Sequence, residues 1–139
     1  MARARLADFL DAAATGYAET RDRPDLAGTS RLSPHLHFGE ISPVQVWRAV
    51  LDRVAAGTIP DSDAWKFLSE LGWREFSHSL LYFNPDMAEV ELMPKFRHFP
   101  WRDDAAALAA WQRGVTGYPI VDAGMRQLWQ TGWMHNRVR

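Results

Sequence analysis

The sequence predicts an all-α protein, and three observations support this fold class. Apolar residues recur at three- and four-residue spacing along most of the chain, which is the period of an amphipathic helix. No segment of any length alternates apolar and polar residues as a half-buried strand does. The chain has 139 residues, 47% of them hydrophobic and 24% charged, which is enough for one domain with a hydrophobic core. We therefore expect a single helical bundle.

The first two long helices are predicted from an apolar stripe and from capping residues. The first helix is expected over about residues 3–20. The second helix has Ser42 as its N-cap, Gln45 completing a capping box, and Gly57 as its stop. The predicted buried stripes are Leu6, Phe9, Leu10, Ala13 and Tyr17 in the first helix, and Trp47, Val50, Leu51 and Val54 in the second.

The second half of the chain is predicted to be helical on both sides of a long connection. A helix over residues 61–83 ends at Asn84 and Pro85, and residues 84–102 form the irregular connection. A short helix begins at residues 103–104 and ends at Gly114, and a last one covers residues 119–131. The predicted inward residues are Trp65, Leu68, Gly72, Phe76 and Leu80 in the long helix, and Met125, Leu128 and Trp129 in the last.

Composition excludes several classes of protein. The absence of cysteine excludes a disulfide scaffold, a thiolate metal site and a cysteine nucleophile, and the five histidines show no metal-ligand spacing. No apolar run approaches the roughly 18 residues of a membrane span. The N-terminus lacks a secretory signal, which favours a cytoplasmic location. The net charge of −1 gives no general basic field, although 14 of the 16 basic residues are arginine, which suits phosphate contacts.

Residues 28–34 carry a candidate phosphate site. They combine a glycine, three hydroxyl side chains and Arg31, just before a short helix with Ser33 as its predicted N-cap and Pro34 in its first turn. Backbone amides at a helix start, with hydroxyls and a guanidinium beside them, form a pocket for a phosphate or pyrophosphate. Simple capping explains the same residue types. The residues by themselves leave both interpretations open.

A second candidate site lies on the 61–83 helix. Glu70, Trp73 and Ser77 are spaced i, i+3 and i+7, so they share one face, away from the predicted core stripe. An indole beside a carboxylate offers a stacking surface and a hydrogen-bond acceptor to a flipped base. The alternative is a surface ion pair between Glu70 and Arg74, with Trp73 packed on a neighbouring helix.

The closing residues 133–139 hold a tryptophan, a histidine, an asparagine and two arginines. Asparagine side chains read base edges and arginine side chains bind phosphates, so Asn136 and Arg137 are candidate nucleic-acid contacts. The alternative is a solvated start of one more helix. Because residues 133–139 show a helix start without a stop signal, we expect the sequence to be a piece of a longer chain.

Four motifs in order resemble the flavin-binding helical domain of the DNA photolyase/cryptochrome family. They are residues 28–34, residues 73–76, residues 117–123 with 125–128, and residues 131–137. The resemblance implies an all-helical domain that binds FAD, of which residues 1–139 are a part. The family's antenna-binding α/β domain, with its pigment, and the C-terminal remainder lie outside this sequence. Since the residues that contact the isoalloxazine ring belong to that remainder, we expect residues 1–139 alone to bind FAD weakly or not at all and to be inactive.

For the parent protein, the resemblance implies a deoxyribodipyrimidine photolyase, a carbon–carbon lyase. Light-excited reduced FAD donates an electron to a cyclobutane pyrimidine dimer in UV-damaged DNA. Trp73 would stack on the dimer, Glu70 would hydrogen-bond it, and Trp101 would be the outermost tryptophan of the chain that photoreduces the flavin. The implied FAD-phosphate contacts are Tyr17, Thr29, Ser30, Arg31, Leu32 and Ser33. The implied DNA contacts are Arg21, Glu70, Trp73, Arg74, Ser77, Asn136 and Arg137.

Two other functions are weighed against repair. A cryptochrome-type blue-light photoreceptor would bind FAD without repairing DNA, but photoreceptor relatives often lose the lesion-facing pair, and Glu70 with Trp73 therefore favours repair. A helical interaction module without a cofactor would use the aromatic residues as core and the hydroxyl loop as helix caps. That module does not explain why several separate segments match one family.

Overall fold

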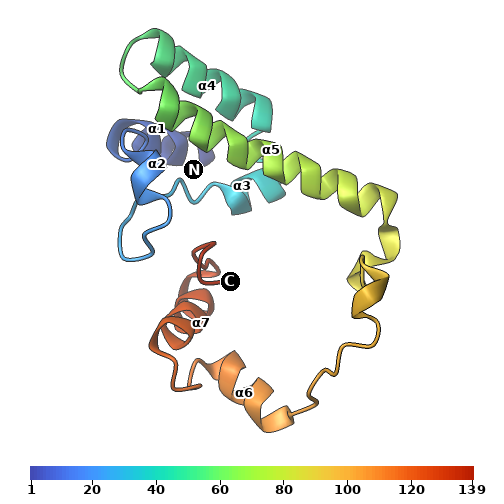
Figure 1. The fold of residues 1–139 in the computed structure, drawn as a ribbon. Coiled ribbons are helices and arrows are strands. Elements are labelled where there is room, and N and C mark those ends of the chain that lie inside the picture. The colour runs from blue at the N-terminus through green and yellow to red at the C-terminus, as the bar shows by residue number, and fades with distance from the viewer. The chain divides into compact units, whose positions relative to one another are not determined.

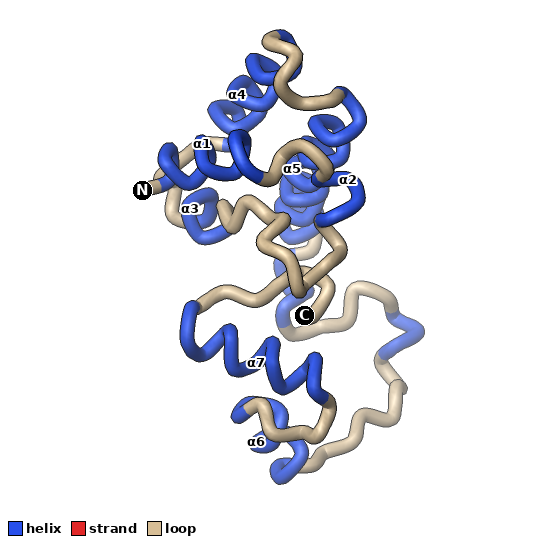
Figure 2. The backbone as a smooth tube through the Cα atoms, turned by 90° about the vertical axis from the view of Figure 1, so that its left-hand side faces the viewer, coloured by secondary structure: helices blue, strands red, loops and turns tan.

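The computed structural model describes residues 1–139, and all its regular structure is helical (Figures 1 and 2). The all-α prediction is therefore confirmed. The chain divides into two compact units, Met1–Phe83 and Asn84–Arg139, where sequence analysis expected one bundle. No helix combines the length and the apolar character that crossing a membrane requires.

The N-terminal unit contains five helices. Where one helix over residues 3–20 was predicted, the structure has two, so that prediction is wrong. The first of them ends at Ala12, with Ala13 as its C-cap at φ −134°, and the second begins after Gly16, which adopts the left-handed conformation with φ +82° and donates its amide to a distant carboxylate. The helices of this unit are α1 (Ala2–Ala12), α2 (Tyr17–Thr20), α3 (Ser33–His37), α4 (Pro43–Ala55) and α5 (Asp61–Phe83).

The core of this unit forms where α2 and α4 pack on α5, with α1 against α4 (Figure 1). At its centre, the rings of Phe9 and Phe67 lie 4.7 Å apart, and Tyr17 meets Phe67 edge-on at 5.3 Å. Such aromatic pairs add roughly 0.5–1.5 kcal/mol beyond their buried area. The short α2 is therefore held by its tyrosine although it has only one turn.

The ends of α4 and α5 agree with prediction, but their buried faces agree only in part. The capping box is present: Ser42 Oγ accepts from the Gln45 amide at 3.2 Å, and Gln45 Oε1 accepts from the Ser42 amide at 2.9 Å. Both helices bury a stripe rotated from the predicted one, because each carries apolar residues on more than one face and only packing selects between them. Of the predicted inward residues, Val50 and Leu68 are buried, Val54 and Leu80 are half-buried, and Trp47, Leu51, Trp65, Gly72 and Phe76 are exposed. The buried positions that were not predicted are Val46, Ala64, Phe67 and Leu71.

The C-terminal unit contains two short 3-10 helices and two α-helices. The first two are η1 (Pro85–Ala88) and η2 (Pro94–Phe96), which lie within the predicted irregular connection. The third, α6 (Ala105–Arg113), begins at its predicted cap, because Asp104 Oδ1 accepts from the Ala107 amide at 2.8 Å, and it ends at Gly114 with φ +65°. The fourth, α7 (Pro119–Thr131), has its predicted bounds and packs against α6.

Two expectations for the end of this unit are wrong. Leu128 and Trp129 are exposed, so that of the three residues predicted to face inward from α7 only Met125 is buried. No helix begins after α7: Gly132 adopts a φ of +69° and ends α7, and the following residues form a turn in which the Val138 amide donates to the His135 carbonyl at 2.9 Å.

Candidate functional site

The loop before α3 presents the candidate phosphate ligands. The helix begins with Ser33 as its first residue and Leu32 as its N-cap, so the prediction of Ser33 as N-cap is off by one position. Ser30 Oγ accepts from the Leu32 amide at 3.4 Å, which bends the chain into α3. The Leu32 side chain is only 2% exposed, and its contribution to a ligand would come from its backbone alone.

The donors of this loop fit an anion. Thr29 and Ser30 are half-buried, and the next residue, Arg31, is exposed. Arg31 is the one non-glycine residue with a positive φ, +52°, a conformation that costs energy and is often found at ligand sites. Residues 28–34 contain no carboxylate, so hydroxyl, amide and guanidinium donors are not opposed by local negative charge.

Gly28 joins this loop to α2. A Cβ at position 28 would lie 2.9 Å from Thr20 Oγ1 and 3.2 Å from the Thr20 carbonyl oxygen, so only glycine allows the two segments to approach this closely. The candidate phosphate loop is therefore supported by α2.

Tyr17, a predicted cofactor contact, is buried in the aromatic cluster of the core. Burial raises the pKa of its hydroxyl to about 12, against a smaller opposite effect of the nearby Arg21 guanidinium. That guanidinium lies 5.9 Å from the centre of the Tyr17 ring. Tyr17 is thus a neutral hydrogen-bond donor at physiological pH.

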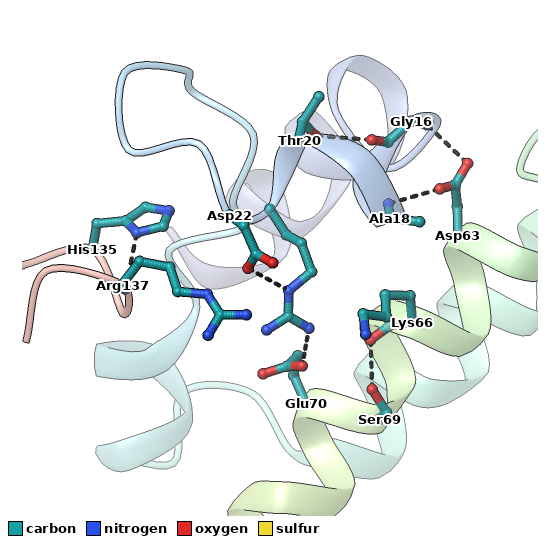
Figure 3. A network of polar contacts seen from close by, with 11 residues as sticks. Gly16, Ala18, Thr20, Asp22, Asp63, Lys66, Ser69, Glu70, His135 and Arg137 are labelled. Carbon is teal, nitrogen blue, oxygen red and sulfur yellow. Dashed lines mark hydrogen bonds and ion pairs between the residues drawn. The ribbon is translucent and has the colours of Figure 1, made fainter.

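Arg21 forms an ion pair with Glu70 and bonds through Nε to Asp22 Oδ1 at 3.1 Å (Figure 3). Its side chain is 10% exposed and that of Glu70 is 31% exposed. Burial by itself lowers the pKa of Arg21. The hydrogen bonds with Glu70 and Asp22 together raise this pKa by more than burial lowers it, so the pKa lies above its usual value. The predicted alternative, an ion pair between Glu70 and Arg74, is wrong, because Arg74 pairs with Glu75.

Trp73 lies on the exposed face of α5 that the spacing predicted. Its side chain is 62% exposed, which contradicts the alternative in which it packs on a neighbouring helix. Its ring meets Phe76 edge-on at 5.7 Å, and the Ser77 hydroxyl donates to the Trp73 carbonyl at 2.9 Å. An open indole thus lies one turn from the Glu70 carboxylate.

The remaining predicted site residues belong to the C-terminal unit. Trp101 is exposed and packs against Phe99 at 4.6 Å between ring centres. Asn136 Oδ1 accepts from Arg139 at 3.2 Å. The Arg137 amide donates to His135 Nδ1 at 3.1 Å (Figure 3). His135 is buried, and its Nε2 has no hydrogen-bond partner.

Sequence reasoning missed two buried carboxylates. Asp63, in the first turn of α5, accepts from the amides of Gly16 and Ala18 at 2.8 Å each (Figure 3). Asp122, in α7, accepts from the Thr116 hydroxyl at 2.6 Å and from the Thr116 amide at 2.8 Å. The partners of Asp63 are 45 and 47 residues away, so no local pattern identifies them. The turn before α7 is a local signal that could have identified Asp122.

Comparison with known proteins identifies the family of this chain. The family model described as the FAD binding domain of DNA photolyase matches residues 67–139. Among curated relatives, the deoxyribodipyrimidine photo-lyase of Agrobacterium fabrum is 52% identical over 97% of this chain and 28% of its own length. Cryptochrome-1 of Arabidopsis thaliana is 40% identical over 96% of this chain and 20% of its own length.

Solved structures agree as well. A bacterial class III photolyase from Agrobacterium tumefaciens matches 99% of this chain and 28% of its own, with 51% identity and a TM-score of 0.95. The cryptochrome of Synechocystis sp. PCC6803 matches 99% of this chain and 29% of its own, with 33% identity and a TM-score of 0.88. The fold and the matched model define the class as an all-helical flavin-binding domain. The chain belongs to the family of the FAD binding domain of DNA photolyase, and it spans less than a third of the length of these relatives.

Proposed function

We propose that residues 1–139 form part of the FAD-binding helical domain of a deoxyribodipyrimidine photolyase, which repairs cyclobutane pyrimidine dimers in UV-damaged DNA. The observation that carries the proposal is the pair on α5: the exposed indole of Trp73 and, one turn before it, the carboxylate of Glu70 paired with Arg21. Membership of the family and 52% identity to a relative with this activity in its name support it.

In this proposal the chain's residues bind and orient the cofactor. The hydroxyls of Thr29, Ser30 and Ser33 and the Arg31 guanidinium hydrogen-bond the phosphates of FAD, and the Leu32 amide adds a backbone donor. Tyr17 stays protonated and lines the same region from the core. FAD, when bound, supplies the electron that cleaves the dimer after excitation by light.

On the DNA side, Trp73 stacks on the flipped dimer and Glu70 accepts hydrogen bonds from the N–H groups of its bases. Arg21 holds Glu70 and, with its remaining donors, contacts the DNA backbone. Side chains of the second unit add further contacts to DNA and an outer tryptophan for photoreduction of the flavin. For DNA these are Asn136 and Arg137, and the outer tryptophan is Trp101. Arg74 and Ser77 of α5, in the first unit, are further proposed DNA contacts.

The test uses Trp73→Ala, with Trp65→Ala as a matched control. Trp65 is also exposed on α5 but is not a site residue. Residues 1–139 are grafted in place of the matching segment of the Agrobacterium fabrum relative, and affinity for a dimer-containing oligonucleotide is measured. Base stacking contributes about 1–3 kcal/mol, so Trp73→Ala should weaken dimer binding roughly 5- to 150-fold, whereas Trp65→Ala should not. Equal affinities of the two variants would contradict the assignment of Trp73.

A blue-light photoreceptor that binds FAD without repair is the second candidate. The 40% identity to Cryptochrome-1 and the TM-score of 0.88 to a solved cryptochrome support it. The grafted protein distinguishes the two, because a photoreceptor segment would support photoreduction of the flavin while leaving pyrimidine dimers intact under illumination.

A further inference from the structure

The short helix α2 is held in place by a carboxylate of another helix. It has four residues, and the residue before it, Gly16, provides no side-chain cap. Asp63 of α5 takes that place: Oδ2 accepts from the Gly16 amide and Oδ1 from the Ala18 amide, at 2.8 Å each. The Asp63 side chain lies in the protein interior, where removing this pair of bonds would leave two amides unsatisfied.

The other end of α2 leads directly to Glu70. Arg21 follows the last residue of α2, its amide donates to the Tyr17 carbonyl at 3.0 Å, and its guanidinium pairs with Glu70. Asp63 and Glu70 are seven residues apart on α5, two turns along one face. Carboxylates of a single helix therefore contact both ends of α2 (Figure 3).

We propose that Asp63 is a positioning residue for Glu70: by accepting from the amides of Gly16 and Ala18 at the start of α2, it sets where Arg21 places its guanidinium and so orients the Glu70 carboxylate. The same helix contacts the candidate phosphate loop through Thr20 and Gly28, so displacement of α2 would also reach that loop. The part of this inference that concerns dimer binding rests on the proposed function; the coupling of Asp63 to Glu70 does not.

The test follows, by NMR, the Nη1–H proton of Arg21 that donates to Glu70, in the full 139-residue chain with neither DNA nor flavin present. The signal is assigned by its loss in Arg21→Lys. A hydrogen bond to a charged group is worth about 1.5–3 kcal/mol, so Asp63→Asn should speed exchange of this proton with water roughly tenfold or more. Glu70→Gln should have the same effect. The exchange rate in the double variant should be no faster than in either single variant, because both substitutions disrupt the same contact between Arg21 and Glu70.

Asp61→Asn is the matched control, an isosteric change of an exposed carboxylate in the same turn of α5, and it should leave the exchange rate unchanged. Asp63→Glu keeps both acceptor oxygens and should recover part of the protection. Wild-type exchange in Asp63→Asn would overturn the proposal. Loss of the whole fold in Asp63→Asn, seen by circular dichroism, would overturn it too, since Asp63 would then support the core and not one helix.

Dimer affinity of the grafted protein separates this inference from the proposed function. Asp63→Asn should weaken dimer binding by the same factor as Glu70→Gln. If Asp63→Asn speeds the exchange of the Arg21 proton and neither variant changes dimer affinity, the coupling of Asp63 to Glu70 is supported and the role of Glu70 in lesion binding is contradicted.

Discussion

The two units of this chain are stabilised by different means. The N-terminal unit has a continuous apolar core, with Phe9, Tyr17 and Phe67 at its centre. In the C-terminal unit, Met125 is the one buried hydrophobic side chain. Large side chains of that unit, such as Trp101 and Trp129, are exposed. Burial of apolar area is the dominant stabilising term in folding. Because the first unit buries more apolar side chains, it gains much more stabilisation from this term.

The C-terminal unit relies on local polar contacts and close backbone approaches. Asp104 caps α6, and Asp122 holds the turn before α7. Gly124 is buried, and a Cβ there would lie 2.4 Å from Val138 Cγ1, so the last residues can pack on α7 only because position 124 has no side chain. The comparison shows that capping and turn residues are enough to form helices in both units, whereas only the N-terminal unit has a continuous hydrophobic core.

The largest expected effect is a core truncation in the first unit. Leu68 is 1% exposed, and Leu68→Ala should cost about 2–5 kcal/mol of unfolding free energy. Leu108 of α6 is 53% exposed, and Leu108→Ala should change stability by less than about 0.5 kcal/mol. Urea unfolding followed by circular dichroism measures both. Similar losses in the two variants would remove the distinction between the units.

A smaller effect is expected from pH, and it has opposite signs in the two units. The pKa of Tyr17, raised by burial to about 12 from 10.0, contributes stability that is fully present below pH 10 and lost as the pH rises through 12. This shift corresponds to roughly 2–3 kcal/mol. The pKa of Asp122 is lowered from 3.8, first by the Thr116 hydroxyl, so its contribution is present above that value and lost as the pH falls below it.

Amide exchange of each unit, measured across the pH range, tests this contrast. Tyr17→Phe should abolish the alkaline loss in the first unit, and Asp122→Asn should abolish the acid dependence of the turn at residues 116–118. Alkaline loosening confined to the second unit would contradict the assignment to Tyr17.

The smallest expected effect comes from the helix caps. Ser42→Ala and Asp104→Ala each remove one side-chain acceptor at a helix start, and each should cost about 1 kcal/mol. Ser42→Ala should lower the stability of the whole first unit, because α4 belongs to its core, and Asp104→Ala should affect α6 alone. Hydrogen exchange resolved by residue separates a local from a unit-wide loss.

Capping and breaking residues predicted the ends of α4, α5, α6 and α7 well, because an N-cap hydroxyl, a proline or a terminal glycine acts on its immediate neighbours. The exposure of Trp73 on a face separate from the core was also predictable from helical periodicity. The family membership followed from several motifs at once.

Other features depended on contacts between distant segments. The start of α2 lies where the Gly16 amide donates to Asp63, 47 residues away, and the choice of buried stripe on α5 depends on α2 and α4 packing there. The sequence by itself determined the helical class, most helix ends and the exposed Trp73, since these are local properties of the chain. Only the tertiary structure decided which faces are buried, where α2 lies and which partner Glu70 has, because those energies arise between residues that meet only after folding.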